Sequence, residues 1–192
     1  DLDDLEEDYL REDPLLTKWE SLAGNASKIE EETGFIVLPG EEVTAENRSG
    51  RNVHMLLINH SRFVPGSGDG LERWFSTRSE HGVSEILDTL PPGALALAAH
   101  PEDPFPWIQR LIIRRSRWSA EDYRHPRLAG MQFLNGAADR WYLEGKKRWI
   151  GLLLEGRRIP LAAGNDAHGN FNRFRQLSLP FLAFRETALH RY

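Results

Sequence analysis

The chain of 192 residues contains no cysteine. Disulfide bonds and thiolate metal sites are therefore excluded, and any metal site must be built from nitrogen and oxygen ligands. Long apolar runs are also missing, because no stretch reaches the 18 apolar residues of a membrane-spanning helix. The chain has no basic stripe interleaved with aromatic residues, which argues against a nucleic-acid partner. No targeting segment assigns it to a compartment, cytoplasmic or exported.

Positive charge is scarce at the start of the chain. Residues 1–13 hold eight acids and one arginine, which contribute −7 to a formal net charge of −5, so the remainder carries +2. Acidic runs of this kind are usually solvated lead-in segments. We therefore divide the chain into an acidic lead-in and helical segment at 1–33 and one domain at 34–192, with 40% hydrophobic residues overall to build its core.

Apolar runs alternate with amphipathic stretches along this domain. The pattern predicts a helix at 15–33, strands at 35–39 and 52–59, a helix at about 71–89, a strand at 94–99, a helix after Trp107 with Ile108, Leu111 and Ile112 on one face, a strand near 129–135, and a long helix that ends at Gly156 before an apolar run at 159–163. Continuous apolar runs such as 94–99 are typical of strands covered on both faces. The alternation of strand and helix predicts α/β architecture with parallel strands.

Five potential metal ligands lie at or near the ends of strand-like runs: Glu42, His54, His100, Asp166 and His168. Side chains two apart in an extended segment point the same way, so Asp166 and His168 could reach one ion together. Each of the five has an ordinary alternative, as a turn residue, a strand cap, a core histidine or a solvated acid. Barrel enzymes, however, collect catalytic groups from several strand ends on one face. The five together favour a metal site, and carboxylate with imidazole suits Zn, Mn or Fe.

The segments 38–44, 53–54, 99–101, 133–136 and 163–169 resemble, in this order, motifs of the polymerase-and-histidinol-phosphatase (PHP) superfamily of metal-dependent phosphoesterases, and within it the carbaryl-hydrolase-like branch. The resemblance implies a distorted (β/α)7-type barrel, related to the TIM barrel, with two or three divalent metal ions. It implies that Glu42 bridges two ions and that His54 and His100 ligate one of them. Asp166 with His168 would hold the other ion or a third.

Two motifs of that superfamily are missing from this chain. The His-x-His and Thr-Asp-His segments that precede the glutamate do not occur in residues 1–41, and the chain has no histidine before His54. Relatives also continue into further strands beyond residues like 181–184. We therefore expect a chain that is truncated at both ends, with the barrel incomplete. Gln132 stands where relatives often carry a glutamate, and we assign it no role.

The activity implied by the resemblance is hydrolysis by a metal-activated water, most directly of a small-molecule phosphate ester. Glu42 and Asp166 are the candidate catalytic carboxylates, with Glu41 facing away, and Arg173 and Arg175 are candidates for substrate binding. A carbamate or carboxylic ester is the alternative substrate at the same site. Two other functions stay open: a non-catalytic PHP-like scaffold or binding domain, and a mononuclear hydrolase of another barrel family with His100, Asp166 and His168 as ligands. The sequence does not predict an oligomeric state.

Overall fold

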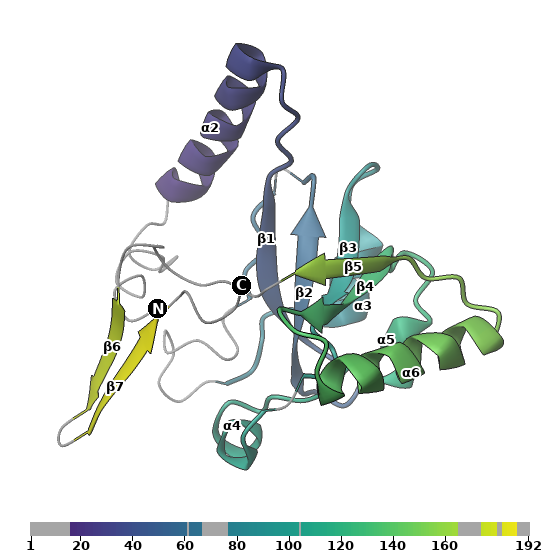
Figure 1. Cartoon of the computed structure of the whole chain (residues 1–192). Helices are drawn as coiled ribbons and strands as arrows, with labels where there is room; N and C mark the ends of the chain where they lie inside the picture. The colour runs from purple at the N-terminus through teal and green to yellow at the C-terminus, as the bar shows by residue number, and fades with distance from the viewer. Residues whose placement is uncertain are drawn as a thin grey trace.

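The computed structural model describes residues 16–60, 62–66, 77–103, 105–164, 174–179 and 182–187. Within them the elements follow in the order α2 (Thr17–Thr33), β1 (Gly40–Glu46), β2 (Asn52–Ile58), α3 (Val83–Thr89), β3 (Leu95–Ala99), α4 (Trp107–Ile112), α5 (Ala120–Tyr123), β4 (Gly130–Asn135), α6 (Arg140–Leu154), β5 (Leu161–Gly164), β6 (Phe174–Leu179) and β7 (Leu182–Thr187) (Figure 1). No helix among the described residues is both long enough and apolar enough to cross a membrane.

The strands form a five-stranded mixed sheet in the order β1-β2-β3-β4-β5, beside a separate antiparallel pair of β6 and β7. The prediction of α/β architecture is confirmed at this level. The prediction of parallel strands holds only for β3, β4 and β5, because β1, β2 and β3 pair antiparallel. The connection from β1 to β2 is a short turn, which can join only antiparallel neighbours. The described strands form an open sheet, not a closed barrel.

The prediction of a strand at 35–39 is wrong, because the structure places β1 at Gly40–Glu46 instead. Phe35 and Ile36 precede it without regular structure and are 71% and 69% exposed. Pro39 has no N–H to donate to a ladder. The paired register runs from Gly40 opposite Ile58 to Glu46 opposite Asn52. Pairing with β2, and not the local apolar run, therefore decides where this strand begins.

The predicted helices are confirmed except at one boundary. Helix α2 ends at Thr33, and Gly34 caps it with a left-handed φ of 70° and an N–H that donates to the Glu30 carbonyl. The helix predicted at about 71–89 begins only at Val83, since residues 77–82 are not helical and 71–76 lie outside the described residues. Helix α6 ends at Leu154, and Gly156 follows with a φ of 82°. Glycine adopts that conformation without a steric penalty, as expected for the residue that closes the helix.

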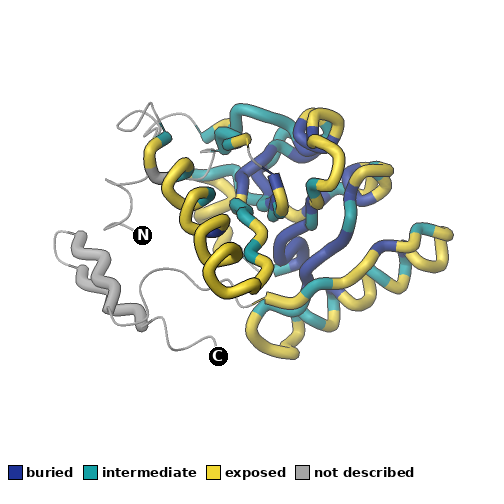
Figure 2. Tube along the Cα trace, turned by 90° about the horizontal axis from the view of Figure 1, so that it is seen from above, coloured by how far each residue is buried: buried dark blue, intermediate teal, exposed yellow. Residues whose placement is uncertain are grey.

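One face of the sheet carries the hydrophobic core. Val43, Met55 and Leu57 alternate with more exposed neighbours along β1 and β2, and they pack with Ile86 and Leu87 of α3. Figure 2 shows this buried part of the trace at the centre, surrounded by exposed segments. Because successive side chains of a strand point to opposite faces, the residues between these core positions point to the other face of the sheet.

Helix α6 closes the core over β4. Gly145 lies against Phe133, so closely that a Cβ atom added to Gly145 would come within 2.4 Å of the Phe133 Cβ. Leu152 is buried on the same helix, and the Trp149 indole donates to the Ile159 carbonyl at 2.9 Å. These contacts fix α6 and the segment that leads into β5, and so they fix the edge of the sheet where β3, β4 and β5 end.

Candidate metal centre

Glu42 and His54 lie on the face of the sheet opposite the core. In the antiparallel register Glu42 is opposite Leu56, and His54 is opposite Thr44. Residues opposite one another share a face, so Glu42 and His54 are diagonal neighbours on it. His54 Nδ1 forms an ion pair with Glu42 Oε1, and the two side chains keep 21% and 28% of their surface exposed. The pairing of β1 with β2 is therefore enough to bring these two ligands together.

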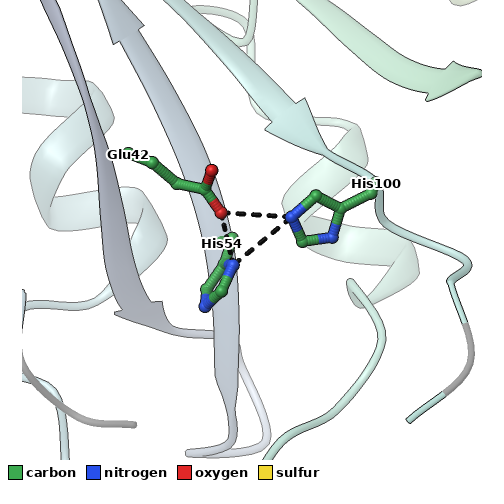
Figure 3. A group of neighbouring side chains, drawn as sticks. All are labelled: Glu42, His54 and His100. Carbon is green, nitrogen blue, oxygen red and sulfur yellow. Dashed lines mark hydrogen bonds and ion pairs between the residues drawn. The ribbon is translucent and has the colours of Figure 1, made fainter. Parts of the chain in front are cut away.

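His100 joins them from the end of β3. It is the first residue after the strand, and its φ of 27° lies in the left-handed region that non-glycine residues rarely adopt. Strained conformations of this kind cost about 1–3 kcal/mol and gather at functional sites. The ring lies beside Glu42 and His54, with Nε2 3.1 Å from Glu42 Oε1 and 3.4 Å from His54 Nδ1 (Figure 3). His100 is the most buried ligand of the three, with 6% of its side chain exposed.

The three ligand atoms fit a metal ion. They lie within 4.8 Å of one another and come from one carboxylate and two imidazoles. Tetrahedral zinc with bonds of about 2.0–2.1 Å separates its ligand atoms by roughly 3.4 Å, close to two of the separations in this cluster. The third pair, Glu42 with His54, is in closer contact and would have to open. Among the described residues this is the one group with metal-binding geometry.

Arg115 contacts the far side of both imidazole rings. Its guanidinium bonds to His54 Nε2 and lies 3.5 Å from His100 Nδ1. An arginine N–H donates only, so this contact holds the His54 lone pair at Nε2 and the proton at Nδ1, toward Glu42. A metal ligand through Nδ1 needs the opposite tautomer, with N–H at Nε2. Metal binding by His54 therefore requires the Arg115 guanidinium to move away from Nε2.

Glu42 stays ionised through the neutral range. Burial raises the pKa of its carboxyl, but hydrogen bonds from His100 and His54 and the charges of these rings lower the pKa more, and its net position is well below the usual range. A carboxylate that is already deprotonated binds a cation without first losing a proton. The Glu42 carboxylate is therefore ready to bind a divalent ion, and binding requires both imidazoles to be neutral and the Arg115 guanidinium to move away.

Glu41 points to the opposite face, as the alternation of a strand requires. Its Oε1 accepts from the Val64 N–H at 2.9 Å and lies 3.2 Å from His60 Nε2. Burial raises the pKa of Glu41 to about 7, against the lowering effect of the Val64 hydrogen bond. Burial also lowers the pKa of His60. The pKa of Glu41 is thus raised and the pKa of Glu42 is lowered, and only Glu42 belongs to the candidate centre.

The remaining predicted site residues stay predictions. Asp166, His168 and Arg173 lie outside the described residues, and Arg175 lies in β6, where only the backbone is described. Strand β5 runs parallel to β4 and β3 and ends at Gly164, two residues before Asp166. The carboxyl ends of parallel strands meet at one edge of a sheet, so β5 ends at the edge that carries His100.

Two polar residues beside this edge were not predicted as site residues. One is Arg115, which belongs to no periodic pattern and reaches the histidines only through the pairing of Arg115 with Asn52. The other is Asn135 at the end of β4, whose Nδ2 donates to Asp103 Oδ2 at 2.5 Å. Its Oδ1 is buried without a hydrogen-bond partner among the described residues. The Asn135-Gly136 turn after an apolar run was a visible signal for the second residue, and the first had none.

Comparison with known proteins gives no independent support for the family resemblance. No family model, curated protein or solved structure matches the chain. The geometry of Glu42, His54 and His100 is therefore the main support for a function.

Proposed function

We propose that the protein is a metal-dependent hydrolase that binds a divalent ion through Glu42, His54 and His100. The observation that carries the proposal is the convergence of three ligand atoms, from β1, β2 and the end of β3, on one point of the face away from the core. Neutral imidazoles with a carboxylate suit Zn, Mn or Fe. A cluster of this composition that also contains a strained histidine is unusual for a site with a purely structural role.

The chemistry at this site follows from its groups. A divalent ion bound there would lower the pKa of a water molecule and neutralise negative charge on a reacting oxygen. Glu42 supplies a permanent negative charge to hold the ion, and the two histidines must be neutral to act as ligands. Arg115 places a cation at the same cluster. A guanidinium matches phosphate oxygens in geometry and charge, so we favour a phosphate ester over an uncharged carbamate or carboxylic ester as substrate.

The family and the barrel are part of the proposal. The parallel pairing of β3, β4 and β5 supports a PHP-like barrel, whereas the antiparallel pairing of β1, β2 and β3 does not. We propose Asp166 and His168 as ligands of a second ion at the shared edge. Arg173 and Arg175 are proposed as substrate-binding residues.

A mononuclear hydrolase is the second candidate. Two histidines and one glutamate, with a coordination position left open, form a ligand set typical of catalytic zinc sites. The described cluster has this composition. One bound ion per chain would favour this candidate, two or three would favour the PHP-like cluster, and none would favour a scaffold or binding domain.

Hydrolysis assays with matched variants test the proposal. The protein is reconstituted with Zn or Mn and assayed with 4-nitrophenyl phosphate and 4-nitrophenyl acetate. Glu42→Gln removes a ligand, whereas Glu41→Gln makes the same chemical change one residue away on the opposite face. We expect metal-dependent phosphate ester hydrolysis that Glu42→Gln abolishes and Glu41→Gln retains. Equal activity of the two variants, or no metal-dependent hydrolysis of either substrate, would contradict the proposal.

A further inference from the structure

A pocket of about 250 Å³ lies between α5, α6 and the loop after β3. At its wall is Glu102, a buried carboxylate with 4% of its side chain exposed. Glu102 accepts from Arg148 Nε at 3.2 Å and from the Tyr123 hydroxyl at 3.4 Å, and its other oxygen lies 3.4 Å from Arg117 Nη1. A buried charge is tolerated only with partners of this kind. Glu102 therefore holds two arginines in fixed positions at the pocket.

Both arginines keep hydrogen-bonding capacity toward the pocket. A guanidinium has five N–H donors, and Glu102 uses one nitrogen of each. Arg148 also stacks on the Tyr123 ring, with 5.9 Å from its central carbon to the ring centre, and Arg117 on the Trp141 ring at 5.6 Å. The two side chains remain 46% and 45% exposed. Contacts within the protein thus orient both guanidinium groups, while each side chain stays partly exposed to solvent.

The charge balance of the pocket is positive. Four cationic and three carboxylate side chains line it, in a chain whose net charge is −5. Arg124 Nη2 and Glu155 Oε2 form an ion pair at 2.7 Å. Lys147 is exposed on α6 and makes no hydrogen bond or ion pair with another described residue. After the Arg124–Glu155 pair is subtracted, Arg117, Lys147 and Arg148 remain with the carboxylates of Glu102 and Glu144, which leaves a net charge of +1.

We propose that this pocket is a second binding site, specific for a small oxyanion such as a phosphate group, held by Arg117, Lys147 and Arg148. Fixed guanidinium groups bind two oxygens of one anion side by side, and an ammonium group adds a point charge. The site does not depend on the metal centre, because none of its residues is a proposed metal ligand. Glu102 acts as a positioning residue, and the anion would contact the cationic groups.

Titration with inorganic phosphate tests this site. Binding is measured by calorimetry and by the NMR signals of the arginine Nε–H groups, with Lys147→Glu as the test variant. Lys146→Glu is the matched control, since Lys146 is the neighbouring exposed lysine and does not line the pocket. Both changes alter the net charge equally and lie at exposed positions, so the thermal unfolding midpoint of both variants should equal that of the wild type.

We expect saturable phosphate binding that shifts the Arg117 and Arg148 signals, weakened about tenfold or more by Lys147→Glu and within about twofold of wild type in Lys146→Glu. The phosphate-induced shifts of the Arg117 and Arg148 signals should persist in Glu42→Gln, which separates this site from the metal centre. The proposal is overturned if wild-type binding is not saturable, if the two lysine variants bind equally, or if binding is lost in Glu42→Gln and kept in Lys147→Glu.

Discussion

Replacing Glu41 with glutamine should change how the stability of the protein depends on pH. Burial raises the pKa of this carboxyl from 4.5 to about 7 in the folded protein. Between these two values the folded state holds the proton more tightly than the unfolded state does, so stability falls as pH rises through this window. A shift of this size corresponds to roughly 3 kcal/mol at 1.36 kcal/mol per pKa unit. The Glu41 side chain is 12% exposed, so water screens part of this energy. The expected loss of folding stability on ionising Glu41 is therefore about 2–3 kcal/mol.

Urea denaturation at about pH 5 and pH 8.5 measures the effect in wild type and Glu41→Gln. At the lower pH Glu41 is protonated when folded, and the two proteins should be similarly stable. At the higher pH the glutamine variant should be the more stable one by about 2–3 kcal/mol, because it carries no buried charge. His60 has a pKa lowered by burial and contributes with the opposite sign, but it is present in both proteins. Glu30→Gln, an exposed change on α2, is the control. A stability difference that is the same at both pH values would refute this account of Glu41.

Three further predictions follow from the same geometry. Arg115→Gln should raise metal affinity about tenfold, because glutamine can accept a hydrogen bond from the His54 Nε2–H that metal binding through Nδ1 requires. Competition with a chelator measures the affinity. Unchanged or weaker affinity would show that Arg115 does not hold His54 in the wrong tautomer. Metal occupancy should fall in acid, since protonated histidines cannot act as ligands, and a pH titration of bound metal that stays flat would speak against His54 and His100 as ligands. Gly145→Ala should destabilise the fold by about 1–3 kcal/mol, because the added methyl group overlaps Phe133. Gly151→Ala on the same helix meets open space and should stabilise the fold by about 0.5–1 kcal/mol. Thermal denaturation measures both, and the reverse order of stability would be inconsistent with the packing of α6.

The part of the site that the sequence predicted depends on local patterns. The apolar runs around His54 and before His100 identify strands β2 and β3. The choice of Glu42 over Glu41 came from the family resemblance. The proline after His100 marks the end of the strand. These signals need no knowledge of which strands are neighbours. They were sufficient to name His54 and His100 as candidates, whereas the strand that carries Glu42 was predicted at 35–39 and lies at Gly40–Glu46.

The rest of the fold depends on contacts between distant parts of the chain. The start of β1 is set by its register with β2, which no local property of residues 35–39 reveals. The antiparallel direction of the first three strands follows from the pairing of β2 with β3, and the sequence between them carries a helix that suggested a parallel crossover. Arg115 reaches the histidines from a segment without a periodic pattern. The periodicity of the sequence does not predict which strands pair or which distant residues come into contact.

The central claim is that Glu42, His54 and His100 bind a metal ion together. Elemental analysis of the purified protein, before and after reconstitution with Zn, Mn or Fe, measures it most directly when wild type is compared with Glu42→Gln and Glu41→Gln. The account predicts at least one ion per chain in wild type and Glu41→Gln and a loss of that ion in Glu42→Gln. Wild-type protein without bound metal after reconstitution, or equal metal content in the two variants, would contradict it.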